Sequence, residues 1–240
     1  MSDTFFWLSL FAISSAVVNT AGIYAVYKNK NWVEKTKTYF MCFAAGLLIS
    51  APLMFALPDA IKKNPYAGFA ALTGFLFMFF SNEFIKYKTK QKSLAFGITA
   101  IEGIGIHSFV DGVTYAVTFS SSILIGFLSA LGLVVHEFAE GAITFAVLME
   151  AKMEKKKAAF YAFLVAGLTT PVGAFITYPV VNKLNSSVLG LALGFVCGVL
   201  IYVSASHLLP EARGYEKEHS VWAFLAGVAL AFFIVIAGGD

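Results

Sequence analysis

Apolar blocks of about twenty residues constrain this sequence more than any other feature. Short gaps separate eight such blocks, at 5–27, 38–61, 66–85, 94–119, 122–149, 158–182, 187–212 and 220–238. A helix of about 20 apolar residues crosses the roughly 30 Å hydrocarbon core of a bilayer. Only 13% of the residues are charged, against about 25% in soluble domains. We therefore predict an all-α integral membrane protein, with eight transmembrane helices in a single domain over residues 1–240.

Basic residues alternate between the gaps that separate these blocks. Of the 17 lysines and arginines, only Lys62, Lys63 and Lys183 lie outside the first, third, fifth and seventh gaps. Short loops rich in lysine and arginine stay on the cytoplasmic side of a membrane. We predict that both termini are extracytoplasmic, in a plasma or inner membrane. The first block follows no basic stretch, so we expect a retained span rather than a cleaved signal peptide.

Several partners are disfavoured by what the sequence lacks. The net charge of +3 comes from loop lysines and not from a basic stripe with interleaved aromatic residues, which argues against nucleic acid. No GxxxxGK[ST] pattern occurs, so we expect no nucleotide partner. Cys42 and Cys197 lie inside apolar blocks without metal-binding spacing, and we interpret them as small buried hydrophobic residues.

An internal similarity relates the second and seventh blocks. At an offset of 152 residues, Gly46, Leu48, Ile49, Leu57, Pro58 and Ala60 recur as Gly198, Leu200, Ile201, Leu209, Pro210 and Ala212. Because an odd number of crossings separates the copies, they would run in opposite directions, as inverted repeats do. Two triplets of spans around a central pair give a 3+2+3 arrangement.

The central pair of blocks carries a second similarity, at an offset of 29 residues. The segment H-S-F-V-D-G, from residue 107, matches H-E-F-A-E-G, from residue 136. In each copy the histidine and the second acidic position are four residues apart, so they share one face of a helix. A serine or glutamate directly after the histidine adds a further oxygen. The candidate metal ligands are His107, Ser108, Asp111, His136, Glu137 and Glu140.

These polar residues need a positive partner, because an ionisable group near a bilayer centre costs about 2.5 kcal/mol or more. A divalent cation satisfies all of them at once. Nitrogen and oxygen ligands without thiolate suit Zn²⁺, Fe²⁺, Mn²⁺, Co²⁺ or Cd²⁺. A lone histidine would be better explained as an interhelical hydrogen-bonding group, but the paired motif favours metal. For Gly112 and Gly141 we favour close helix packing over a role in metal access.

The two motifs resemble those of the ZIP (Zrt/Irt-like) divalent-metal transporters, whose fourth and fifth spans carry H-N-x-P-E-G and H-E-x-P-E-G patterns. The L-P-E-A ending of the seventh block is similar too, and the resemblance covers the whole chain. It is closest to a prokaryotic-type short form without a histidine-rich loop. The resemblance implies that the six candidate residues bind a cation midway across the membrane.

The same resemblance implies a function. The chain would carry zinc, and also iron, manganese or cadmium, toward the cytoplasm by alternating access, often as a homodimer. Spans one, four, five and six would move like an elevator against spans two, three, seven and eight. The metal is then the transported substrate and not a catalytic cofactor.

Departures from the family pattern affect the expected site. Ser108 replaces the usual asparagine and Asp111 the usual glutamate, while Val110 and Ala139 replace prolines. Some family members complete a second metal position with a glutamate of the sixth span, where this chain has Thr170. We therefore predict one dominant metal rather than a binuclear pair.

Other polar residues have weaker interpretations. Thr169, Thr170 and Pro171 read as a proline-broken helix whose freed carbonyls accept bonds from the threonine hydroxyls. His207 and Glu211 are four apart on the seventh span and are candidates for the metal pathway, against a capping or hydrogen-bonding role. Asn19 is a weak candidate for lining that pathway. Three acidic residues are interpreted as interfacial or paired away from the site: Asp59, Glu83 and Glu102.

The alternative from another class is an intramembrane zinc-dependent hydrolase. The sequence from His136 to Glu140 resembles a zincin helix, with Glu137 as a general base. The second histidine of HExxH is absent, and the other motif would fill the position that an enzyme keeps open for water. We therefore predict a transporter without catalytic residues. A structural or receptor protein would leave the duplicated acidic motif unexplained.

Overall fold

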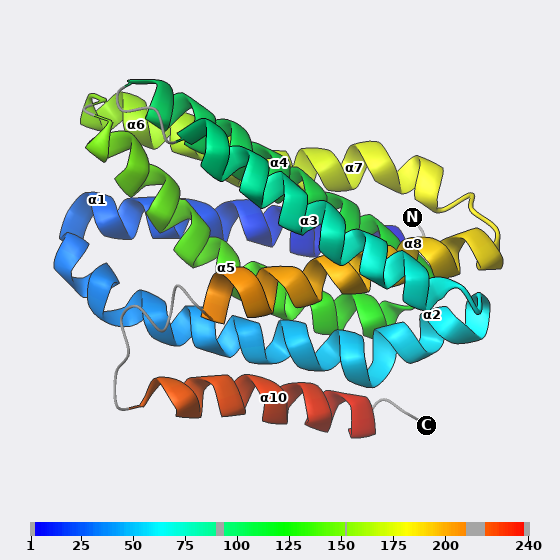
Figure 1. Ribbon diagram of the computed structural model, residues 1–240. Helices are drawn as coiled ribbons and strands as arrows, with labels where there is room; N and C mark the ends of the chain where they lie inside the picture. Colours follow the sequence, from blue (N-terminus) through cyan, green and yellow to red (C-terminus); the bar gives the residue numbers. More distant parts are fainter. Residues whose placement is uncertain (1–2, 90–93, 152, 210–218, 238–240) are drawn as a thin grey trace.

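The computed structural model describes residues 3–89, 94–151, 153–209 and 219–237, and the regular structure in these ranges is helical (Figure 1). The long helices lie roughly along one another in a bundle. The elements are α1 (Asp3–Ala51), η1 (Pro52–Ala56), α2 (Leu57–Lys63), α3 (Ala67–Thr89), α4 (Leu94–Ser121), α5 (Ile123–Glu150), α6 (Lys155–Ala162), η2 (Phe163–Gly167), α7 (Thr169–Val181), α8 (Ser186–Tyr202), η3 (Val203–Leu208) and α10 (Ser220–Ala237).

The helices coincide with the apolar blocks. Helix α1 covers the first two blocks and reverses at Asn29, whose φ of −149° and ψ of 83° are not helical. Five stretches have the length and composition to cross a membrane, namely Asp3–Asn29, Thr38–Lys63, Ile123–Met149, Lys155–Val181 and Ser186–Ser206. Two shorter apolar helices lie at Ala67–Ser81 and Ser220–Ile236. These findings confirm the all-helical architecture and agree with an integral membrane protein.

Close helix packing around the motifs depends on two glycines. A Cβ at Gly141 on α5 would overlap the carbonyl oxygen of Asn19 on α1, and a Cβ at Gly112 on α4 would overlap that of Thr170 on α7. Side chains at these positions would force the helices apart. Gly112 and Gly141 are therefore close-packing residues, as predicted.

A second set of glycine contacts holds the other helices together. On α8, Gly194 and Gly198 face the backbone of Ala67 and Ala71 on α3. Gly46 on the second arm of α1 faces the backbone of α10, which runs along that arm in Figure 1. Cys42 and Cys197 are buried and free in this part of the bundle, which confirms the interpretation of both as small core residues.

In the part of the chain that the structure describes, three short π-helical turns interrupt the α-helices. The turns η1 and η3 occupy matching positions at the offset of 152 residues, since Pro52 corresponds to Ser204 and Ala56 to Leu208. The third, η2, ends before Thr169, whose hydroxyl donates to the Val165 carbonyl. A threonine hydroxyl thus bonds a helix carbonyl at Thr169 as predicted, whereas the Thr170 hydroxyl donates to Glu137 instead. Such turns are rare and are frequent at functional sites.

The acidic residues outside the motifs lie near helix ends where they can be described. Asp59 on α2 forms an ion pair with Lys63 and accepts a hydrogen bond from Ser121 Oγ at 3.2 Å. Glu83 is exposed toward the end of α3. Both placements agree with an interfacial position. The side chain of Glu102 lies outside the described residues.

Candidate metal site

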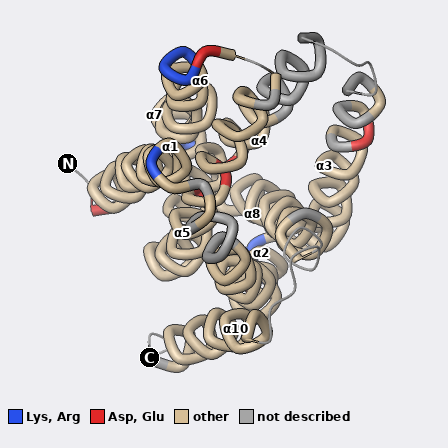
Figure 2. Tube along the Cα trace, turned by 90° about the vertical axis from the view of Figure 1, so that its left-hand side faces the viewer, with Lys and Arg blue, Asp and Glu red and all other residues tan. Residues whose placement is uncertain are grey.

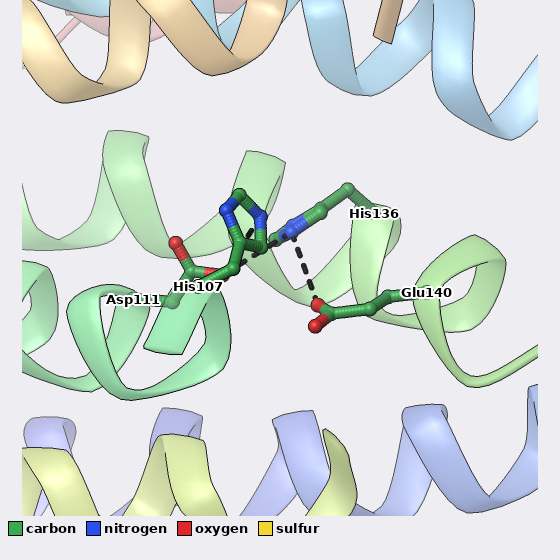
Figure 3. A group of neighbouring side chains, drawn as sticks. All are labelled: His107, Asp111, His136 and Glu140. Carbon is green, nitrogen blue, oxygen red and sulfur yellow. Dashed lines mark ion pairs between the residues drawn. The ribbon is translucent and has the colours of Figure 1, made fainter. Parts of the chain in front are cut away.

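The two central motifs meet in the interior of the bundle, where α4 and α5 pack against each other. Each helix contributes a histidine and the acid four residues later (Figure 3). One possible ligand atom from each of His107, Asp111, His136 and Glu140 lies within 4.8 Å of all the others. Figure 2, which looks along the bundle, shows acidic residues in its interior between the helices. Within the described residues, this is the one group of three or more such side chains.

Imidazole nitrogens and carboxylate oxygens converge in this cluster. His136 Nε2 lies 3.3 Å from Asp111 Oδ2 and 3.5 Å from Glu140 Oε2. His107 Nε2 lies 3.6 Å from the same Asp111 oxygen. The side chain of Asp111 is 1% exposed and that of His107 is 18% exposed. These separations are long for hydrogen bonds but match atoms arranged around a common centre.

The orientation of His136 leaves one ring nitrogen for the centre of the cluster. Its Nδ1 lies 2.7 Å from the carbonyl oxygen of Leu133, one turn earlier on α5. A carbonyl only accepts, so Nδ1 carries a proton, and in the neutral ring Nε2 presents a lone pair. A hydrogen bond of this kind is what orients metal-binding histidines in proteins.

Several atoms of the cluster are buried without a hydrogen-bond partner. They are both carboxylate oxygens of Asp111, Nε2 of His136 and Oε2 of Glu140. Buried polar groups are nearly always satisfied, and an unpartnered carboxylate is costly in a low-dielectric interior. Three of them, Asp111 Oδ2, His136 Nε2 and Glu140 Oε2, lie close to one another, and a cation that binds between them would explain the arrangement. The chemistry of the donor set, two imidazoles and two carboxylates, suits zinc and its neighbours.

Ser108 lies beside the cluster and donates a hydrogen bond to one of its acids, Glu140. Its side chain is fully buried, and Oγ lies 2.5 Å from Glu140 Oε1 and 3.0 Å from the carbonyl of Ile104. The hydroxyl therefore holds one oxygen of Glu140 and leaves Oε2 turned toward His136. The structure places Ser108 next to the four residues as a hydrogen-bond donor to one of them.

Replacing Ser108 with alanine is expected to weaken Zn²⁺ binding by about tenfold, because outer hydrogen bonds to a ligand are worth roughly 10–100-fold in metal affinity. Isothermal titration of the purified variant with Zn²⁺ measures the change. Ser14→Ala is a matched control, since the Ser14 hydroxyl donates to a carbonyl on the exposed face of α1. Equal affinities for wild type and Ser108→Ala would contradict a bracing role.

Glu137, the remaining candidate ligand, lies outside this cluster. Its carboxylate is fully buried and accepts two hydrogen bonds of 2.8 Å, one from Asn19 Nδ2 on α1 and one from Thr170 Oγ1 on α7. From the sequence, Asn19 was only a weak candidate for lining the pathway. Thr170 was interpreted as part of a proline-broken helix and as the residue that replaces a glutamate of some family members. The structure instead brings both side chains to one buried acid.

The two candidate pathway residues of the seventh span are not placed. The backbone of His207 belongs to η3, but its side chain lies outside the described residues, and so does Glu211.

A buried pair that sequence reasoning missed is Ser15 and Tyr115, whose oxygens are 2.6 Å apart. Tyr115 is four residues after Asp111, so helical spacing alone could have drawn attention to it.

These features define a class: a helical membrane protein whose interior holds an imidazole and carboxylate cluster suited to a divalent cation. Comparison with known families agrees, since the family described as ZIP Zinc transporter matches residues 88–235. The chain belongs to this family.

Individual relatives support the same assignment. The zinc transporter ZupT of Akkermansia muciniphila is 29% identical over 196 residues, which cover 81% of this chain and 69% of that protein. ZupT of Chlorobium chlorochromatii is 30% identical, over 62% of this chain and 54% of the relative. ZupT of Clostridium perfringens is 30% identical, over 44% and 47%. The chain thus spans about half the length of the last two relatives.

Proposed function

We propose that this protein carries divalent transition-metal cations, zinc foremost, across a membrane toward the cytoplasm. The observation that carries the proposal is the cluster of His107, Asp111, His136 and Glu140, in which the last three residues have buried polar atoms without a hydrogen-bond partner. The matched relatives are named zinc transporters, which supports zinc as the substrate. Ligand chemistry of this type also admits iron, manganese and cadmium.

The proposed membrane arrangement has eight crossings, external termini and a 3+2+3 inverted repeat within one domain, residues 1–240. Helix bounds support the repeat. At the offset of 152 residues, Asp3 at the start of α1 corresponds to Lys155 at the start of α6. Ala67 at the start of α3 falls one residue before Ser220, where α10 starts. The same offset relates the turns η1 and η3.

Alternating access by an elevator movement is the mechanism that we propose. Its support is the distribution of glycine contacts. Close backbone contacts at glycines join the first arm of α1 to α5 and α4 to α7, all in the proposed moving spans, and join α3 to α8 in the proposed static spans. Between moving and static spans, Gly132 on α5 instead faces the side chains of Leu47 and Leu48 on the second arm of α1. Side-chain contacts exchange more easily than backbone contacts. An inside-negative potential of 100 mV contributes about 2.3 kcal/mol per elementary charge moving inward.

We propose a single dominant metal in this site. Thr170 stands where a second-site acid would be needed, and its hydroxyl already donates to Glu137. His207 and Glu211 stay candidates for the cytoplasmic part of the route. A homodimer in the plasma or inner membrane completes the proposal.

The hydrolase alternative is disfavoured. The family and its named members are transporters. Four protein ligands would also surround the ion, whereas a catalytic zinc site keeps three and leaves a position for water.

The test is uptake of radioactive Zn²⁺ into liposomes that contain the purified protein. We expect uptake by the wild type and loss of uptake in His136→Ala and Glu140→Ala. His219→Ala is the matched control, because this histidine is exposed at the start of α10, outside the cluster. A wild type that carries none of zinc, iron, manganese and cadmium would overturn the proposal.

Uptake is expected to fall as the external pH is lowered from 8 toward 5. Metal binding requires neutral imidazole and ionised carboxylates, so protons compete with the cation at acid pH. Initial rates of Zn²⁺ uptake between pH 8 and pH 5, at constant membrane potential and internal pH, measure the effect. A rate that rises steadily toward pH 5 would contradict histidine ligation.

A further inference from the structure

Glu137 differs from the other acids of the central motifs in how its oxygens are occupied. Asp111 and Glu140 keep buried oxygens without hydrogen-bond partners. Both oxygens of Glu137 accept hydrogen bonds, from Asn19 on α1 and Thr170 on α7. A carboxylate whose oxygens are both held by neutral donors from other helices has less capacity left for a cation.

The residues that supply these two donors also make close backbone contacts between the helices. The carbonyl oxygen of Asn19 packs on Gly141, directly after Glu140 on α5. The carbonyl oxygen of Thr170 packs on Gly112, directly after Asp111 on α4. Side-chain bonds to one acid and backbone contacts to two glycines therefore join α1, α4, α5 and α7 around the cluster.

We propose that Glu137 is a positioning residue that clamps α1 and α7 to α5 and so holds His136 and Glu140 in place, without itself binding the cation. The effect of Glu137 on cation binding rests on the proposed function, whereas its hydrogen bonds to Asn19 and Thr170 belong to the fold. Groups that orient metal ligands are known to control affinity strongly. A rigid set of four helices also suits a unit that moves as one body.

The Asn19 amide supplies a way to separate this role from ligation. Its Oδ1 is buried and has no hydrogen-bond partner. If glutamine replaces Glu137, its oxygen can accept from Thr170, and its amide can donate to Asn19 Oδ1 once the Asn19 amide rotates. Glutamine therefore preserves the clamp. A carboxylate that binds the cation has no comparable replacement, because glutamine removes its negative charge.

The experiment measures Zn²⁺ affinity by titration calorimetry and thermal unfolding in metal-free buffer, on the full chain in nanodiscs. We expect Glu137→Gln to stay within about threefold of the wild-type Kd, while Glu137→Ala, Asn19→Ala and Thr170→Val weaken binding by about 10–100-fold. The last three variants should also lower the metal-free Tm. Glu140→Gln, the ligand control, should lose Zn²⁺ without lowering that Tm.

Two results would overturn the clamp. In one, Glu137→Gln loses Zn²⁺ as completely as Glu140→Gln while keeping the wild-type metal-free Tm, which would make Glu137 a ligand. In the other, Glu137→Ala leaves both Kd and Tm unchanged. Failure of the clamp can be told apart from failure of the proposed function. If the wild type binds no Zn²⁺, the proposed function fails, and the metal-free Tm values of the variants still test the clamp.

Discussion

Replacing Asp111 with asparagine is expected to weaken Zn²⁺ binding by more than about 100-fold, and to abolish uptake while leaving the protein folded. Oδ2 of Asp111 lies close to both histidines, at 3.3 Å from His136 Nε2 and 3.6 Å from His107 Nε2. Asparagine has almost the same shape but lacks the charge. The loss would therefore reflect electrostatics and not packing.

The same substitution is expected to preserve or raise stability in the absence of metal. Both Asp111 oxygens are buried without hydrogen-bond partners, and replacing an uncompensated buried charge relieves its desolvation cost. Thermal unfolding with and without Zn²⁺ tests both statements, and zinc should raise the Tm of the wild type only. A large fall in the metal-free Tm of Asp111→Asn would show that the acid supports the fold rather than a cation.

Substituting alanine for Gly141 is expected to destabilise the protein by about 3 kcal/mol, at the upper end of the range for overpacking. Its Cβ would overlap the Asn19 carbonyl and would lie 2.8 Å from Asn19 Oδ1. Helix α1 would have to move away from α5, which would also strain the hydrogen bond to Glu137. Zn²⁺ affinity should fall together with stability.

Gly68 on α3 is the matched control, because a Cβ there would meet no atom within 4 Å. Gly68→Ala should cause no loss and can gain up to about 1 kcal/mol, since alanine is the better helix former. Denaturant unfolding in micelles compares the two alanine variants. Equal stabilities would mean that α1 and α5 can separate freely, contrary to the packing that the structure shows.

The helices were largely predictable because the bilayer imposes its requirement residue by residue. Each apolar block must satisfy its own backbone hydrogen bonds, so blocks of about 20 residues become helices whatever their neighbours are. The bend at Asn29 falls in the gap between two predicted spans. The π-helical turns were not predicted, since they depend on how neighbouring helices pack.

The sequence by itself determined that this chain is an all-helical membrane protein of the ZIP family, with a histidine and an acid on one face of each central helix. Helical spacing was sufficient for that, because residues four apart always share a face. Only the tertiary structure decided which acids meet. It joined Asp111 and Glu140 to the histidines and turned Glu137 toward Asn19 and Thr170. Contacts between distant segments depend on how glycine-lined helices pack, and spacing within one helix carries no record of that geometry.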